Sequence, residues 1–317
     1  MAQTKLLKDP LPNAPTGPIH HKAIEFHHPN YPLRLSHLFS LPRVDRTRDP
    51  DIGFGIHHGT ALLACRIVAG NVAGGRLCVD RHENEPVGSG PDEVLDGDMY
   101  YFVLADYPVP GPPYAIVPSF SDWAFPHGAV SESWPLPSDL SHDPSVRCIV
   151  SRDGLVLKKA HGLGIDSHRN IVNLRADLHK IYDANTFVFV PKKEIYGPDS
   201  GHDPLPYVLH VLKNDDVGEV GTMFHNVPLQ GTEHTMREFH LARFARAILR
   251  GVEAFILQGH PRVVLRADEG GEPTVRELSG AVLKDLYGGG GARTSSPLNP
   301  RKRRRSGERN EDYRYDG

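Results

Sequence analysis

Three side chains near the middle of the chain have the types and the order needed for metal-assisted hydrolysis. His161 ends a segment that we expect to be the second strand of a hairpin, Asn170 lies in the following loop, and His179 lies in an expected helix. Such chemistry needs a divalent ion beside a scissile phosphate and a base that can take a proton from the attacking water. We expect His161 to be that base, because a strand end fixes the ring and leaves one face open.

The ligands of the ion are expected in the same loop and helix. His179 and Asp183 are one helical turn apart, so an imidazole and a carboxylate share one face. Either both bind the ion, or Asp183 orients His179 through a hydrogen bond. Asn170 either pins the loop through backbone groups or offers its amide oxygen as a ligand. The cofactor is then Mg²⁺, Mn²⁺ or Zn²⁺, and these residue types leave the choice open.

The surrounding sequence predicts the elements that hold these residues. Residues 147–151 and 155–161 are β-prone runs around an Asp-Gly pair, which is typical of a hairpin. An apolar stripe predicts a helix that begins near Asn173 and ends at Asp183. Residues 186–190 predict a further strand. Hairpin, loop and helix together have the layout of a ββα-metal core.

Several runs in this region resemble the HNH endonuclease domain found in many fungal proteins. The runs that carry the likeness are Cys148-Ile149-Val150-Ser151, Ala160-His161, residues 170–183 (NIVNLRADLHKIYD), residues 187–192 (FVFVPK) and, downstream, residues 238–248 (EFHLARFARAI). The spacing of nine residues from Asn170 to His179 is that of HNH motifs. The resemblance implies a metal-dependent nuclease that acts on DNA, with His161 as general base and with Asn170 and His179 as the other signature residues.

An alternative interpretation is a catalytically degenerate HNH scaffold that serves as a nucleic-acid or protein binding module. Ala160 stands where many HNH nucleases carry an acidic metal ligand, and the loop from His161 to Asn170 is short. Asp166 and His168 lie in that loop and are further candidate ligands. The alternative predicts that the protein binds no metal ion.

Charge is distributed unevenly along the chain. Residues 289–317 contain eight Lys or Arg and four Asp or Glu, which leaves 28 basic and 35 acidic residues for the rest. An acidic body argues against a broad surface that coats DNA without specificity. Contact with nucleic acid therefore has to come from local patches or from the basic C-terminal segment.

Composition and pattern predict an α+β fold in five parts. We expect an irregular lead-in over residues 1–58 and a β-rich domain over residues 59–140. The HNH ββα-metal domain follows over residues 141–195. A helical extension that packs on it is expected over residues 196–287, and a disordered basic tail over residues 288–317.

The β-rich half has its own expected strands. Residues 60–69 are apolar enough for a buried strand, which we expect to pair with residues 76–80 after a Gly-Gly turn. Residues 99–106 predict a third strand. Frequent proline over residues 108–137 predicts an extended arm anchored by its two tryptophans.

Two features are expected near the C-terminus. A capping box formed by Thr235 and Glu238 predicts a long helix that runs to about Leu257. The tail has few apolar residues and should be disordered. Its basic run indicates a nuclear-import signal or a nonspecific nucleic-acid arm, so DNA and an import receptor are the expected partners and the nucleus the expected location. This run is Arg301, Lys302, Arg303, Arg304 and Arg305.

Other features exclude certain classes of protein or indicate no functional site. No stretch offers about 20 uninterrupted apolar residues for a bilayer, and the first ten residues show no secretory signal. The three cysteines lack a C-x-x-C pair and fit a reducing compartment. The sequence indicates no oligomeric state. Three histidine pairs are expected to be turn and surface residues: His20-His21, His27-His28 and His57-His58.

Overall fold

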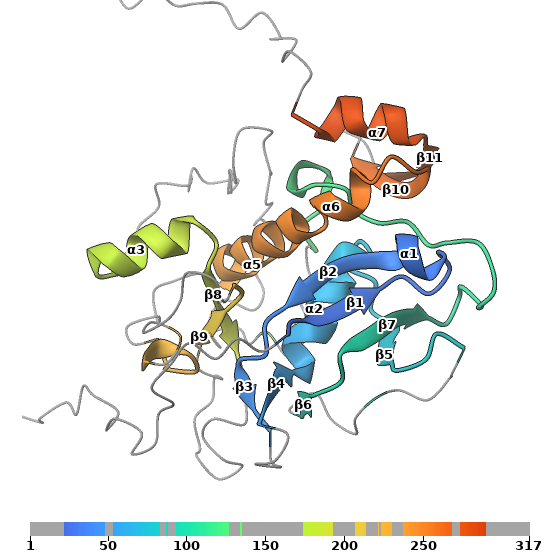
Figure 1. Ribbon diagram of the computed structural model, residues 1–317. Helices are drawn as coiled ribbons and strands as arrows, with labels where there is room; N and C mark the ends of the chain where they lie inside the picture. The colour runs from blue at the N-terminus through green and yellow to red at the C-terminus, as the bar shows by residue number, and fades with distance from the viewer. Residues whose placement is uncertain are drawn as a thin grey trace, which may run out of the picture.

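The computed structural model describes eleven segments of the chain, which contain both strands and helices (Figure 1). A mixed α+β class is therefore confirmed. Within these segments no helix combines the length and the apolar character needed to cross a membrane. The described residues are 22–47, 53–82, 87, 93–126, 134, 174–192, 207–213, 221, 223–229, 237–267 and 273–289.

The described elements are named here in chain order. The strands are β1 (Ile24–His27), β2 (His37–Leu41), β3 (Asp45–Arg46), β4 (Phe54–His57), β5 (Gly75–Cys78), β6 (Val94–Leu95), β7 (Met99–Leu104), β8 (Phe187–Pro191), β9 (Tyr207–Val211), β10 (Arg262–Ala267) and β11 (Pro273–Leu278). The helices are α1 (Leu33–Ser36), α2 (His58–Val68), α3 (Ala176–Asp183), α5 (Arg237–Gly251), α6 (Glu253–Ile256) and α7 (Gly280–Tyr287), with a 3-10 turn η1 (Phe120–Asp122).

A four-stranded sheet in the order β2-β1-β7-β5 forms the largest β layer. β1 runs parallel to β7, whereas the two outer pairs are antiparallel. Phe26 of β1 stacks on Phe39 of β2 with ring centroids 5.1 Å apart, which fixes the inner face of the sheet. Helix α5 packs against α2, β2 and β8, so it joins this sheet to the later part of the chain (Figure 1).

Three smaller sheets complete the β structure. They are β3-β4-β6, β8-β9 and β10-β11. β8 and β9 pair antiparallel from Phe187 opposite Val211 to Pro191 opposite Tyr207. Every residue of β9 is buried. The polar side chain of His210 on β9 is therefore inside the protein.

One hydrophobic cluster contains buried residues from most of the described elements, from Ile24 to Leu283. Helix α5 contributes Phe244, Ala245, Ile248 and Leu249, which all lie on its buried face. Helix α5 therefore shares one core with α3, β8, β9 and the N-terminal strands. Because this core is closely packed, a substitution in one element disturbs the packing of the others.

The expectation of an irregular lead-in is wrong for residues 22–47. This stretch contains β1, β2, β3 and the helical turn α1, and it supplies two strands of the main sheet. The strands are short, and proline and histidine interrupt their pattern. Ile24 and Phe26 are nevertheless fully buried. Pairing with β7, far along the chain, stabilises them and is invisible to a local pattern.

Residues 60–69 are also corrected, since they form most of helix α2 instead of a strand. Ala61, Ala64, Cys65 and Val68 recur at the spacing of one helical face and are all buried. The helix begins at a cap, because the Thr60 backbone N–H donates to the His57 ring. The expected partner, β5, pairs with β7 instead.

Two further segments agree with the sequence in part. Residues 99–104 form β7, as expected, and the arm after it buries Trp123 and Trp134, each 2% exposed. The segment expected to be one long helix contains α5, followed after Val252 by the short helix α6. Thr235, the expected capping residue, lies outside the described part of the chain.

Candidate functional site

Helix α3 carries the two expected ligands on its exposed face. Leu178 is buried, and Ile181 and Tyr182 pack against the core, so the opposite face of the helix is turned outward. His179 and Asp183 lie on that outer face, with their side chains 58% and 62% exposed. The Nδ1 atom of His179 is 3.1 Å from Oδ2 of Asp183. The predicted pairing of the two across one helical turn is therefore present.

Helix α5 brings an arginine to the same place. The Arg243 guanidinium lies over the Tyr182 ring, 4.3 Å from its centroid, and its Nη2 donates to the Tyr182 carbonyl. The same Nη2 is 4.0 Å from Oδ1 of Asp183. Burial lowers the pKa of Arg243, but a guanidinium stays charged in proteins. A fixed positive charge thus stands beside the carboxylate that contacts His179.

The other expected catalytic residues lie outside the described residues. These are His161, Asn170 and the predicted hairpin over residues 147–161. The basic run from Arg301 to Arg305 is outside them as well. The structure therefore describes α3 and the following strand β8, but not the geometry that joins His161 or Asn170 to His179.

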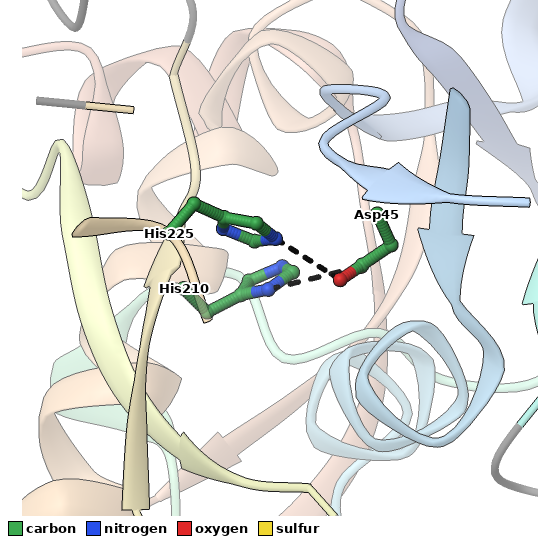
Figure 2. A group of neighbouring side chains, drawn as sticks. All are labelled: Asp45, His210 and His225. Atoms are coloured by element: carbon green, nitrogen blue, oxygen red, sulfur yellow. Dashed lines mark hydrogen bonds and ion pairs between the residues drawn. The ribbon is translucent and has the colours of Figure 1, made fainter. Parts of the chain in front are cut away.

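A second cluster of metal-type ligands, which the sequence did not suggest, is buried between β3 and β9. Asp45, His210 and His225 each offer an atom, and these atoms lie within 4.8 Å of one another. Figure 2 shows both imidazoles directed at the Asp45 carboxylate. The Nε2 atom of His225 is 3.0 Å from Oδ1 of Asp45, and Nδ1 of His210 is 4.0 Å from Oδ2.

Lysine and asparagine side chains complete this buried cluster. Lys192, directly after β8, places Nζ 2.6 Å from Oδ1 of Asp45 and 2.9 Å from Oδ1 of Asn226. Asn226 in turn donates to the same Asp45 oxygen, at 3.0 Å. The second oxygen, Oδ2, accepts the backbone N–H of His57 at 2.7 Å. Both oxygens of Asp45 are therefore engaged by donors.

Four separate elements deliver these side chains. β3 pairs with β4, which places Asp45 beside the N-terminal cap of α2. The segment that follows the helical turn at residues 223–224 runs beside β9, since the Asn226 N–H donates to the Leu209 carbonyl and the Leu209 N–H to the Val227 carbonyl. This pairing sets His225 next to His210, with ring centroids 5.2 Å apart.

The electrostatics of the cluster are those of a buried ion pair. Burial alone would raise the pKa of Asp45, but Lys192 and His225 outweigh it and hold the pKa well below its usual value. Burial, aided by Lys192, holds the pKa of His210 well below its ordinary range against the opposing pull of Asp45. Burial also lowers the pKa of His57 to about 4. Asp45 is thus charged and His210 and His57 are neutral at pH 7.

This cluster contains atom types that bind metal ions, but the positions that an ion would need are occupied by protonated nitrogens. The Lys192 ammonium already stands where a cation would neutralise Asp45, and a second positive charge there would be repelled. The Val211 N–H donates to Nδ1 of His225 at 3.3 Å, so the proton of a neutral His225 is on Nε2, where it donates to Asp45. A metal ion needs the lone pair of that nitrogen. The cluster therefore acts as an internal ion pair.

Sequence reasoning missed this cluster for a definite reason. Asp45 and His225 are 180 residues apart, and neither belongs to a motif. The one available signal was the position of His210 inside the apolar run that forms β9. The paired histidines were also misjudged, because His27, His28, His57 and His58 are buried. His57 caps α2 and His28 stacks on Tyr114, so both have structural roles.

A cavity of about 250 Å³ lies between β2, the C-terminal part of α5 and the residues that directly follow β9. Its charged lining residues are Lys213, Arg250 and Glu253, and the C-terminal end of α5 adds partial negative charge.

Comparison of the chain with models of protein families, with curated proteins and with solved structures finds no match in any of the three. Conclusions about function therefore depend on the residues and their geometry.

Proposed function

We propose that this protein is an HNH-type, metal-dependent endonuclease that hydrolyses phosphodiester bonds in DNA. The observation that carries the proposal is the exposed pair of His179 and Asp183 on α3, with 3.1 Å between Nδ1 and Oδ2. Imidazole nitrogen and carboxylate oxygen are donors that suit Zn²⁺ and Mn²⁺. Both side chains are open to a large substrate, unlike the buried Asp45 cluster.

The proposed mechanism divides the work among the chain's own residues. His179 offers a ring nitrogen, and Asp183 either binds beside it or orients it. His161 accepts the proton of the attacking water. Asn170 holds the loop between them or adds its amide oxygen as a ligand. A divalent ion bound there would stabilise the charge that develops on the phosphate and on the leaving oxygen.

Plasmid nicking tests the proposal. Wild-type protein with Mg²⁺, Mn²⁺ or Zn²⁺ should convert supercoiled plasmid to the open circle, and His161→Ala should lower the rate by about 100-fold or more, as expected for loss of a general base. His260→Ala is the matched control, because His260 is an exposed histidine near the end of α6. Equal background cleavage by wild type and His161→Ala would reject catalysis.

The second candidate function is a degenerate HNH scaffold that binds nucleic acid or protein. One observation favours it: within the described segments, the group of three or more ligand-type side chains that lie close together includes neither His179 nor Asp183. This candidate predicts that dialysed protein contains no metal ion. Stoichiometric metal by elemental analysis, absent from His179→Ala, would exclude it.

A further inference from the structure

We infer that Arg243 is a positioning residue of the proposed hydrolytic site, which acts through Asp183 to set the tautomer of His179 so that Nε2 is the nitrogen offered to a metal ion. The role of this arrangement in metal binding rests on the proposed function. Its geometry can be measured without metal or DNA.

The two oxygens of Asp183 face different partners. Oδ2 is 3.1 Å from Nδ1 of His179, and Oδ1 is 4.0 Å from Nη2 of Arg243. An ionised carboxylate only accepts hydrogen bonds, so a hydrogen bond between these two atoms requires the proton of His179 to be on Nδ1. In a neutral imidazole the lone pair is then on Nε2. Asp183 is therefore an orienting partner of His179, and the alternative of direct ligation by both side chains is not needed.

Arg243 is the fixed member of the three. Its side chain is 17% exposed, whereas those of His179 and Asp183 are more than half exposed. It is held by stacking on Tyr182 and by its bond to the Tyr182 carbonyl. An exposed pair at this helical spacing is weak, so it would form only part of the time if left alone. A held charge beside Asp183 favours the carboxylate position that also meets His179.

A purely structural role for Arg243 makes a different prediction. Basic side chains often bond the last carbonyls of a helix, and Tyr182 is in the last turn of α3. Such a capping role needs neither Asp183 nor His179. Removing Arg243 would then lower stability and leave the tautomer of His179 unchanged.

The test is ¹⁵N NMR of histidine-labelled protein at pH 8. His179→Ala identifies the His179 signals. Wild type should show the Nδ1–H tautomer at His179. Asp183→Ala and Arg243→Met should both shift the population toward the Nε2–H form. Asp177→Ala on α3 and Arg246→Met on α5 are exposed matched controls and should leave it unchanged.

Each outcome decides the inference. A His179 tautomer that stays as in wild type in Arg243→Met overturns it, whether or not the melting temperature falls. An unchanged tautomer in Asp183→Ala overturns it as well. A wild-type protein that does not nick DNA rejects the proposed function and leaves the NMR result to decide the inference alone. Where nicking occurs, Arg243→Met should raise the Mn²⁺ concentration for half-maximal rate about 10-fold, the effect typical of a lost outer partner of a ligand.

Discussion

Lys192 and Asp45, 147 positions apart, form a buried ion pair with Nζ 2.6 Å from Oδ1. Their side chains are 2% and 6% exposed. Through this pair the strand β3, early in the chain, is fastened to the end of β8. Because His57, His225 and Asn226 also donate to Asp45, the carboxylate is fully satisfied without any added ion.

Lys192→Met should destabilise the protein by about 3–5 kcal/mol, because it leaves the buried Asp45 carboxylate without its ammonium partner. The free energy of unfolding from urea denaturation measures the effect. Lys180→Met, at an exposed position of α3, is the matched control and should change it by less than about 0.5 kcal/mol. A loss below about 1 kcal/mol for Lys192→Met would show that the pair contributes little.

The Asp45 cluster should not be the metal site. His210→Leu should retain the metal content of wild type after dialysis, whereas His179→Ala should lose it. The reason is that Lys192 and the tautomer of His225 oppose a cation in the cluster. Elemental analysis of the folded variants measures this. A stoichiometric loss of metal in His210→Leu would reverse the assignment.

The free energy of unfolding should decrease less at low pH in His240→Phe than in wild type. Burial lowers the pKa of His240 to about 4, so the unfolded chain binds a proton near pH 6.5 and the folded protein does not. The unfolded state therefore binds more protons between these values, and stability falls as the pH drops through this window. For His240 alone the loss from pH 7.5 to pH 4.5 is about 2.5 kcal/mol.

Urea denaturation of wild type and His240→Phe at both pH values measures the difference. The substitution keeps an aromatic ring against Phe189 and Tyr207. An identical pH dependence in the two proteins would show that His240 does not titrate as its burial implies.

Deletion of residues 301–305 should move the protein out of the nucleus, because five consecutive basic residues fit an import signal. Fluorescence microscopy of tagged protein measures the location. The melting temperature should stay the same, since the segment is poor in apolar side chains. Unaltered nuclear accumulation would refute the import hypothesis, and a large drop in melting temperature would show that the segment packs on the body.

The sequence predicted the elements of the site that the structure describes, α3 and β8. The helix over residues 176–183 and the strand β8 after it follow from short-range apolar periodicity, and that periodicity also predicts which face of α3 is exposed. His179 and Asp183 were placed correctly relative to each other, because their geometry depends only on helical spacing.

The long-range part could not be predicted. Helix α2 was taken for a strand, because a ten-residue apolar run fits either element. The link between Asp45 and Lys192, and the approach of Arg243 to Asp183, arise from packing of distant segments around α5. No local spacing encodes either contact, so only the fold shows them.

The most direct test of the central claim is the rate of plasmid nicking by His179→Ala at saturating Mn²⁺, compared with His260→Ala. The account predicts that His260→Ala keeps the wild-type rate, while His179→Ala loses about 100-fold or more, because it removes the proposed ligand itself. Equal rates for His179→Ala and wild type would contradict the claim that this helix carries the catalytic metal site.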